Sequence, residues 1–118
     1  MFDKITEVSL LYDFYGQLLS KRQQEVMSLY YEENLSLSEI AEEFSISRQG
    51  VHDALKNAEK SLHQYEVKLG LVSRFEKSRR AVEMIDRQIE AVIDKNRDNS
   101  DLVSSLAEIR SVIDEMEQ

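Results

Sequence analysis

The sequence contains no cysteine, no proline and no tryptophan, and it has only three glycines among its 118 residues. The absence of cysteine excludes disulfide bonds, thiolate zinc sites and a thiol nucleophile. Because proline and glycine supply most tight turns, their scarcity disfavours a fold of short strands. No apolar run approaches the length of a membrane span, and the first residues lack a signal-peptide pattern. We therefore expect a cytoplasmic protein without membrane contact.

The apolar residues recur at steps of three and four, which is the period of a helix. On residues 5–19 these steps predict one buried face, formed by Ile5, Val8, Leu11, Tyr12, Tyr15, Leu18 and Leu19. Capping-box pairs, Ser20 with Gln23 and Ser36 with Glu39, predict that a helix begins after each serine. The inward side chains of the second helix are expected to be Val26, Met27, Leu29 and Tyr30. The whole pattern predicts an all-α fold with further helices over residues 21–33, 37–44, 48–69, 71–94 and 102–116.

Residues 37–55 carry the pattern of a helix-turn-helix. Ala41 is the small residue that a steep crossing of two helices requires, Ser45 lies at the turn, and Val51 packs into the angle. The remaining core positions of the motif are apolar: Ile40, Phe44, Ile46, Ala54 and Leu55. The turn position favours glycine because its backbone is left-handed, and a serine there costs roughly 1–2 kcal/mol. We therefore expect a distorted or slightly longer turn at Ser45.

Several segments together resemble the YlxM family of small bacterial helix-turn-helix proteins. The resemblance covers roughly residues 5–70 and rests on residues 14–15, 18–23, 29–31, 35–42 and 47–51. It implies a helix-turn-helix similar to region 4 of RNA polymerase sigma factors, without a wing, in a regulatory protein. It also implies a link to the signal recognition particle pathway, through gene neighbourhood. The sequence departs from the family pattern at Gly50, where alanine is usual, at His52, where tyrosine is usual, and at Asn57, near an often basic position.

The second helix of the motif has the side chains of a recognition helix. Arg48 and Gln49 are of the types that read guanine and adenine edges by paired hydrogen bonds. Lys56 and Lys60 lie one turn apart and can neutralise phosphates, and Ser36 can offer a backbone N–H to phosphate. The candidate nucleic-acid-binding residues are Ser36, Ser47, Arg48, Gln49, His52, Lys56 and Lys60.

The charge of the chain opposes DNA binding. The formal net charge is −8, and residues 20–61 contain five basic and eight acidic side chains. Because phosphate neutralisation supplies most non-specific DNA affinity, a monomer should bind DNA weakly, and a dimer could recover affinity. The alternative hypothesis is an accessory protein that does not bind DNA but binds the signal recognition particle GTPase subunit or its RNA.

A second basic patch comprises Arg74, Lys77, Arg79 and Arg80. It could contact phosphate, RNA or an acidic partner. The interpretation that we favour is a solvated helix face with ion pairs four residues apart, such as Glu76 with Arg80 and Arg79 with Glu83.

Nothing in the sequence indicates an enzyme, a metal site or a cofactor. His52 and His63 are eleven residues apart, about three helical turns, and cannot share a metal. No catalytic triad pattern and no glycine-rich phosphate loop is present. The aromatic residues are expected in the core, with Tyr31 the one expected to be exposed.

The chain is expected to divide into a helix-turn-helix domain over residues 1–70 and a helical hairpin over residues 71–118. The wholly polar residues 94–100 predict the connector of this hairpin. Leu102, Leu106, Ile109, Ile113 and Met116 follow the steps of an a/d seam. We expect a homodimer through apolar residues of the extension: Phe75, Val82, Ile89, Leu102, Leu106 and Ile109. The alternative is that these residues pack only within one chain.

Overall fold

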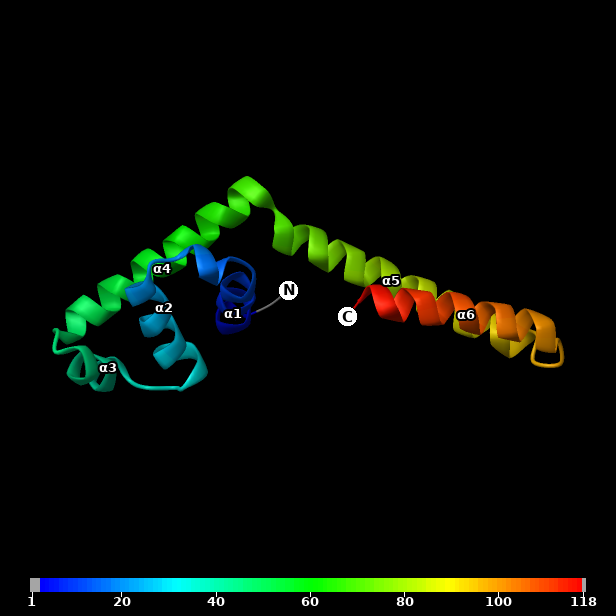
Figure 1. The fold of residues 1–118 in the computed structure, drawn as a ribbon, viewed down its shortest axis with the longest axis horizontal. Helices are drawn as coiled ribbons and strands as arrows, with labels where there is room; N and C mark the ends of the chain where they lie inside the picture. Colours follow the sequence, from blue (N-terminus) through cyan, green and yellow to red (C-terminus); the bar gives the residue numbers. More distant parts are fainter. Residues whose placement is uncertain (1–2, 118) are drawn as a thin grey trace. The chain divides into compact units, whose positions relative to one another are not determined.

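The computed structural model describes residues 3–117, and these residues form helices and turns with no strand (Figure 1). The predicted all-α fold is confirmed. In chain order the elements are α1 (Lys4–Tyr15), the 3-10 turn η1 (Gly16–Leu18), α2 (Lys21–Met27), the π turn η2 (Ser28–Glu32), α3 (Leu37–Phe44), α4 (Arg48–Leu69), α5 (Leu71–Lys95) and α6 (Ser100–Met116).

The helix boundaries follow the capping residues of the sequence. Ser20 caps α2 and Ser36 caps α3, each in a complete capping box with the glutamine or glutamate three residues later. Gly70 ends α4 in the left-handed conformation, with φ of 63°. Asp3 also caps α1, because its carboxylate accepts the Thr6 N–H at 2.8 Å. This hydrogen bond lowers the pKa of Asp3.

The chain forms two compact units, Met1–Val72 and Ser73–Gln118. In the first unit α4 is the central helix, and α1, α2 and α3 all pack against it. Its Val51, Ala58 and Leu62 are completely buried. The other completely or nearly completely buried side chains of this core are Val8, Leu11, Tyr15, Val26, Met27 and Ile40.

Several side chains that were predicted to be buried are exposed. Ile5 and Leu18 are 67% and 55% exposed, and Tyr30, Phe14 and Ile46 are each more than one third exposed. For Leu18, the prediction assumed one α-helix through residue 19, but α1 ends at Tyr15 and the following 3-10 turn changes the direction of this side chain. Ile5 and Tyr30 instead line a shallow surface pocket.

The prediction that Tyr31 is exposed is also wrong. The π turn η2 advances the chain differently from an α-helix, and it leaves Tyr31 half-buried against the core. Tyr31 is hydrogen-bonded to Glu59 of α4, a carboxylate that is itself buried and lies 3.9 Å from Lys4 Nζ. Burial, together with the nearby Glu59 charge, raises the pKa of Tyr31 to about 12.

Tyr15 and Glu66 join α1 to the junction between α4 and α5. The buried Tyr15 hydroxyl donates to Glu66 Oε1 at 2.5 Å and accepts the Leu71 N–H at 3.0 Å. Glu66 Oε1 also accepts the Val72 N–H at 3.0 Å. These bonds satisfy N–H groups in the first turn of α5, which have no partner within their own helix.

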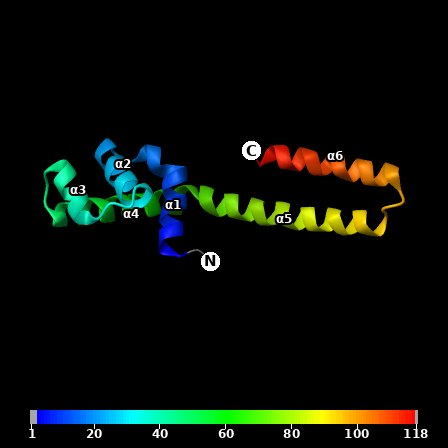
Figure 2. The same cartoon turned by 90° about the horizontal axis from the view of Figure 1, so that it is seen from below.

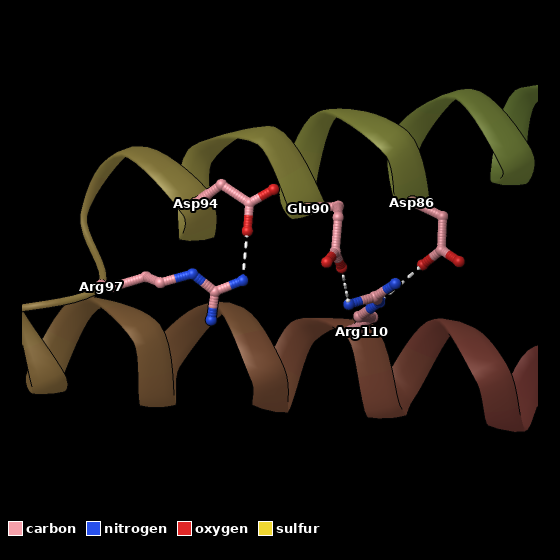
Figure 3. Close-up of polar contacts among 5 residues, drawn as sticks. All are labelled: Asp86, Glu90, Asp94, Arg97 and Arg110. Atoms are coloured by element: carbon pink, nitrogen blue, oxygen red, sulfur yellow. Dashed lines mark hydrogen bonds and ion pairs between the residues drawn. The ribbon is translucent and has the colours of Figure 1, made fainter.

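The second unit is an antiparallel hairpin of α5 and α6 (Figure 2). Arg110 of α6 crosses to α5, where Nε donates to Asp86 at 3.0 Å and Nη1 donates to Glu90 at 2.6 Å (Figure 3). These two hydrogen bonds raise the pKa of Arg110. At the connector, Arg97 pairs with Asp94. Ile89 is the one buried apolar side chain in the described part of this unit.

The predicted a/d seam of α6 is partly wrong. Leu102, Leu106 and Ile113 are half-buried, but Ile109 is 51% exposed and Met116 is 76% exposed. Arg110, four residues after Leu106, is less exposed than Ile109, because its ion pairs hold that side of α6 toward α5. The face of α6 that contacts α5 is therefore rotated from the one that the apolar pattern indicates.

Replacement Tyr15→Phe tests the bonds at the junction of α4 and α5. It removes one donor and one acceptor from a buried site and leaves the Leu71 N–H without its partner, so we expect a loss of about 1–3 kcal/mol in the free energy of unfolding. Urea denaturation followed by circular dichroism measures this loss. Tyr65→Phe is the matched control, because the Tyr65 hydroxyl makes a longer, exposed bond to the Leu18 carbonyl at 3.3 Å. Equal losses for the two variants would contradict a special role of Tyr15.

Candidate nucleic-acid interface

The helix-turn-helix consists of α3, the turn at Ser45 and the first half of α4. Ala41 and Val51 are both buried at the crossing of the two helices, as predicted. Ser45 has φ of 55° and ψ of 44°, which is the left-handed conformation that the motif requires. The Ile46 N–H then donates to the Ala41 carbonyl at 3.0 Å and closes the end of α3. The expected distortion of the turn is therefore wrong, since serine adopts the conformation in which glycine is usual.

Ser47 begins the recognition helix α4. Its hydroxyl accepts the Gly50 N–H at 2.9 Å. A Cβ atom at Gly50 would lie 3.2 Å from Ser47 Oγ and 3.7 Å from Ile46 Cδ1. The close neighbours of Gly50 are thus the cap and turn of its own motif, and no other helix approaches it.

All seven predicted nucleic-acid-binding residues are exposed. Six of them belong to α4 or its cap. Gln49, Lys56 and Lys60 lie on the side opposite the buried Val51, Leu55 and Ala58, whereas Arg48 is exposed as the first residue of the helix. Ser36 lies apart from these six, at the N-terminus of α3. The structure therefore gathers Ser47, Arg48, Gln49, His52, Lys56 and Lys60 on one helix.

The backbone of Ser36 already has an acidic partner. Its N–H donates to the Glu39 carboxylate at 2.9 Å, and this bond lowers the pKa of Glu39. A phosphate would have to displace this carboxylate to reach the same N–H. Ser36 is consequently a weaker candidate contact than its place at a helix N-terminus indicates.

Asp53 is a member of the site that the sequence prediction omitted. Gln49 Nε2 donates to Asp53 Oδ1 at 2.9 Å. His52 Nδ1 lies 3.5 Å from both Gln49 Nε2 and Asp53 Oδ1. The spacing of four residues between Gln49 and Asp53 is the signal that could have shown this pair. The amide that would read a base is therefore held by a carboxylate of its own helix.

Most acidic residues of residues 20–61 belong to elements other than α4. Of the eight acidic side chains in residues 20–61, only Asp53 and Glu59 belong to α4, and Glu59 is buried against Tyr31. Among residues 3–117, no carboxylate lies within ion-pairing distance of Arg48, Lys56 or Lys60. The exposed face at the start of α4 therefore carries three unpaired cations and one carboxylate, although the surrounding segment is net acidic.

The second basic patch belongs to α5. Arg79 Nε lies 3.4 Å from Glu83 Oε1, so one of the two predicted pairs is present, whereas within residues 3–117 Glu76 and Arg80 form no ion pair. Arg74, Lys77 and Arg80 are exposed on the same helix. They belong to the second unit, whereas α4 belongs to the first.

Within the described residues, no group of three histidine, aspartate or glutamate side chains is arranged to hold a metal ion. His63 lies beside Glu7, with 3.8 Å between Nδ1 and Oε1, well removed in sequence from His52. No described helix is long and apolar enough to cross a bilayer.

Comparison with known proteins points to one family. The model of a family described as helix-turn-helix protein, YlxM / p13 like, matches residues 2–104. A UPF0122 protein of Desulforamulus reducens is 54% identical over 81 residues, which cover 68% of this chain and 69% of that protein. A UPF0122 protein of a Thermoanaerobacter species is 42% identical over 116 residues and 98% of each chain. Another, of Halalkalibacterium halodurans, is 42% identical over 106 residues, which cover 90% of this chain and 94% of that protein.

Replacement Ser45→Gly tests the strain at the turn. Glycine adopts the left-handed conformation without the steric cost that serine bears, so we expect the free energy of unfolding to rise by about 0.5–1 kcal/mol. Thermal and urea denaturation measure this change. Ser38→Gly, at an exposed position in the first turn of α3, is the control and should destabilise by about 0.5 kcal/mol. A loss of stability in Ser45→Gly would contradict the proposed strain.

Proposed function

Since this chain belongs to the YlxM / p13-like family of helix-turn-helix proteins, we propose that it is a regulatory protein that binds duplex DNA through α4. The observation that carries the proposal is the charge of the exposed face of α4. Arg48, Lys56 and Lys60 are unpaired there, and the acidic residues that make the segment net negative lie elsewhere or are buried.

Each side chain on α4 has a distinct role in this proposal. Arg48 lies in the first turn, where a recognition helix enters the major groove, and its fork of donors suits the two acceptors of a guanine edge. Lys56 and Lys60 follow one and two turns after His52 and neutralise phosphates. Gln49 reads an adenine edge only after its amide leaves Asp53, so part of its binding energy is used to break that bond.

A single helix-turn-helix with three free cations has little electrostatic affinity. We therefore propose that the protein acts as a homodimer, in which two recognition helices contact the same duplex. Linking two weak sites raises the overall affinity by the effective concentration of the second site, without a new contact.

Charge reversal at Arg48 tests the site directly. Arg48→Glu replaces a base contact by a repelling carboxylate, and we expect the dissociation constant for a labelled mixed-sequence duplex to rise by about 30-fold or more. Fluorescence anisotropy at low salt measures it, and circular dichroism confirms that the helices persist. Lys68→Glu makes the same charge change at the other end of α4 and should leave the affinity nearly unchanged. Unchanged affinity in Arg48→Glu would contradict the proposal.

Replacement Asp53→Asn tests the inhibitory carboxylate. It removes the one exposed negative charge of the α4 face and keeps the shape of the side chain, so we expect roughly threefold tighter DNA binding at low salt. The same anisotropy titration detects the gain. Asp13→Asn, an equal charge change on the exposed part of α1, is the control. If both variants bind equally well, the gain reflects net charge and the assigned role of Asp53 is wrong.

A second candidate function follows from the overall charge of −8. An acidic surface favours a basic partner, and the resemblance to YlxM proteins suggests the GTPase subunit of the signal recognition particle or its RNA. In this alternative the helix-turn-helix serves as a scaffold. A complex of the two purified proteins that survives nuclease treatment, together with no DNA binding at low salt, would favour it over the DNA-binding function. Loss of the complex on RNA digestion would instead indicate an RNA-mediated contact.

A further inference from the structure

The hairpin of α5 and α6 leaves one of its two faces apolar and uncovered. Val82 of α5 and Leu106 of α6 are seam residues, which face the other helix of the hairpin. The residues four positions later, Asp86 and Arg110, share one face of the hairpin, since they meet at 3.0 Å. In two antiparallel helices, the residues four positions before the seam residues therefore lie together on the opposite face of the hairpin. Ile85 precedes the buried Ile89 by four residues, and Ile109 precedes Ile113 by four. The polar ion-pair network and these two isoleucines therefore occupy opposite faces of the hairpin.

The apolar face extends along both helices. On α5 the stripe continues from Ile85 to Val92, seven residues later, and on α6 it continues from Ile109 to Val112 and Met116. These five side chains are between 39% and 76% exposed. A helical hairpin of this size with one buried apolar side chain lacks a sufficient core of its own, and an exposed apolar face of this kind marks an interaction surface.

We propose that a second copy of this hairpin covers the apolar face, so that the extensions of two chains form a four-helix bundle. The face suits its own copy in size: the 17 residues of α6 span about 26 Å, and two adjacent helices are about 20 Å wide. Covering such a face buries an area of the order of the ~800 Å² per partner that stable interfaces remove from water.

The charges of the two helices also favour a second copy. Helix α5 has six basic and five acidic side chains, whereas α6 has one basic and four acidic side chains. A two-fold axis parallel to the helices places α5 of each chain against α6 of the other, so that helices of opposite net charge adjoin. Contact between two copies of α6 would instead juxtapose like charges.

This surface differs from the dimer contacts that the sequence analysis named. The structure assigns Val82, Leu102 and Leu106 to the half-buried seam of a single hairpin, and Ile89 is buried there. Of the residues named for the dimer, Ile109 lies on the apolar face. The inference specifies the interface of the homodimer that the proposed function invokes, but it holds whether or not the protein binds DNA.

A pair of neighbouring substitutions tests the proposal. Val112→Glu places a charge at the centre of the apolar face, whereas Ser111→Glu adds the same charge to the same helix one residue earlier, about 100° away toward the polar face. Both positions are exposed, so both variants should keep the helical content of the wild type in circular dichroism. Sedimentation equilibrium of the full chain without nucleic acid gives the molar mass and the dimer dissociation constant.

We expect wild type and Ser111→Glu to show twice the 13.8 kDa mass of one chain. Val112→Glu should raise the dimer dissociation constant by about 30-fold or more, the effect of losing a central interface anchor. A wild-type protein that stays at the mass of one chain at every concentration would overturn the proposal, and so would equal dissociation of the two variants. Because no DNA is present, neither result depends on the proposed DNA-binding function.

Discussion

Burial of one stripe of α4 is the constraint on which the first unit depends. Val51, Ala58 and Leu62 have no exposed surface, and α1, α2 and α3 are held in place by packing against them. Each such side chain contributes roughly 1.5–3 kcal/mol when it is removed from water. Because a helix has 3.6 residues per turn, fixing this stripe inward also fixes which side chains face outward. The exposure of Lys56 and Lys60 is therefore a consequence of the same packing, and Arg48 is exposed because it is the first residue of the helix.

Local polar contacts determine where the helices begin and end. Two capping boxes, the left-handed Ser45 and the left-handed Gly70 set the boundaries of α2, α3 and α4. Together they place the Ser47 cap directly after the turn, so that Arg48 is the first residue of the recognition helix. The bonds of Tyr15 and Glu66 stabilise the next junction in a similar way, by accepting N–H groups of the first turn of α5.

The fold class, the motif and the helix boundaries could be predicted from the sequence, because serine caps, a single Ala41 and helical periodicity are local signals. The burial of Tyr31 could not be predicted, since the direction of its side chain depends on a π turn that an ideal helix pattern does not contain. The seam of α6 was misassigned because the ion pairs of Arg110 hold its side of α6 toward α5 and leave Ile109 exposed. The charge of the exposed site could be established only from the structure. A count of charges along the sequence cannot show that Glu59 is buried or that Asp53 accepts a hydrogen bond from Gln49.

The central claim is that the exposed face of α4 contacts the phosphates of a duplex although the chain is acidic. The most direct test is the salt dependence of DNA binding by the wild-type protein, measured by fluorescence anisotropy with a mixed-sequence duplex. The account predicts micromolar affinity at low salt and a plot of log K against log salt with a slope of about −2 per helix-turn-helix, from the two phosphates that Lys56 and Lys60 neutralise. No binding at low salt, or binding without salt dependence, would contradict it.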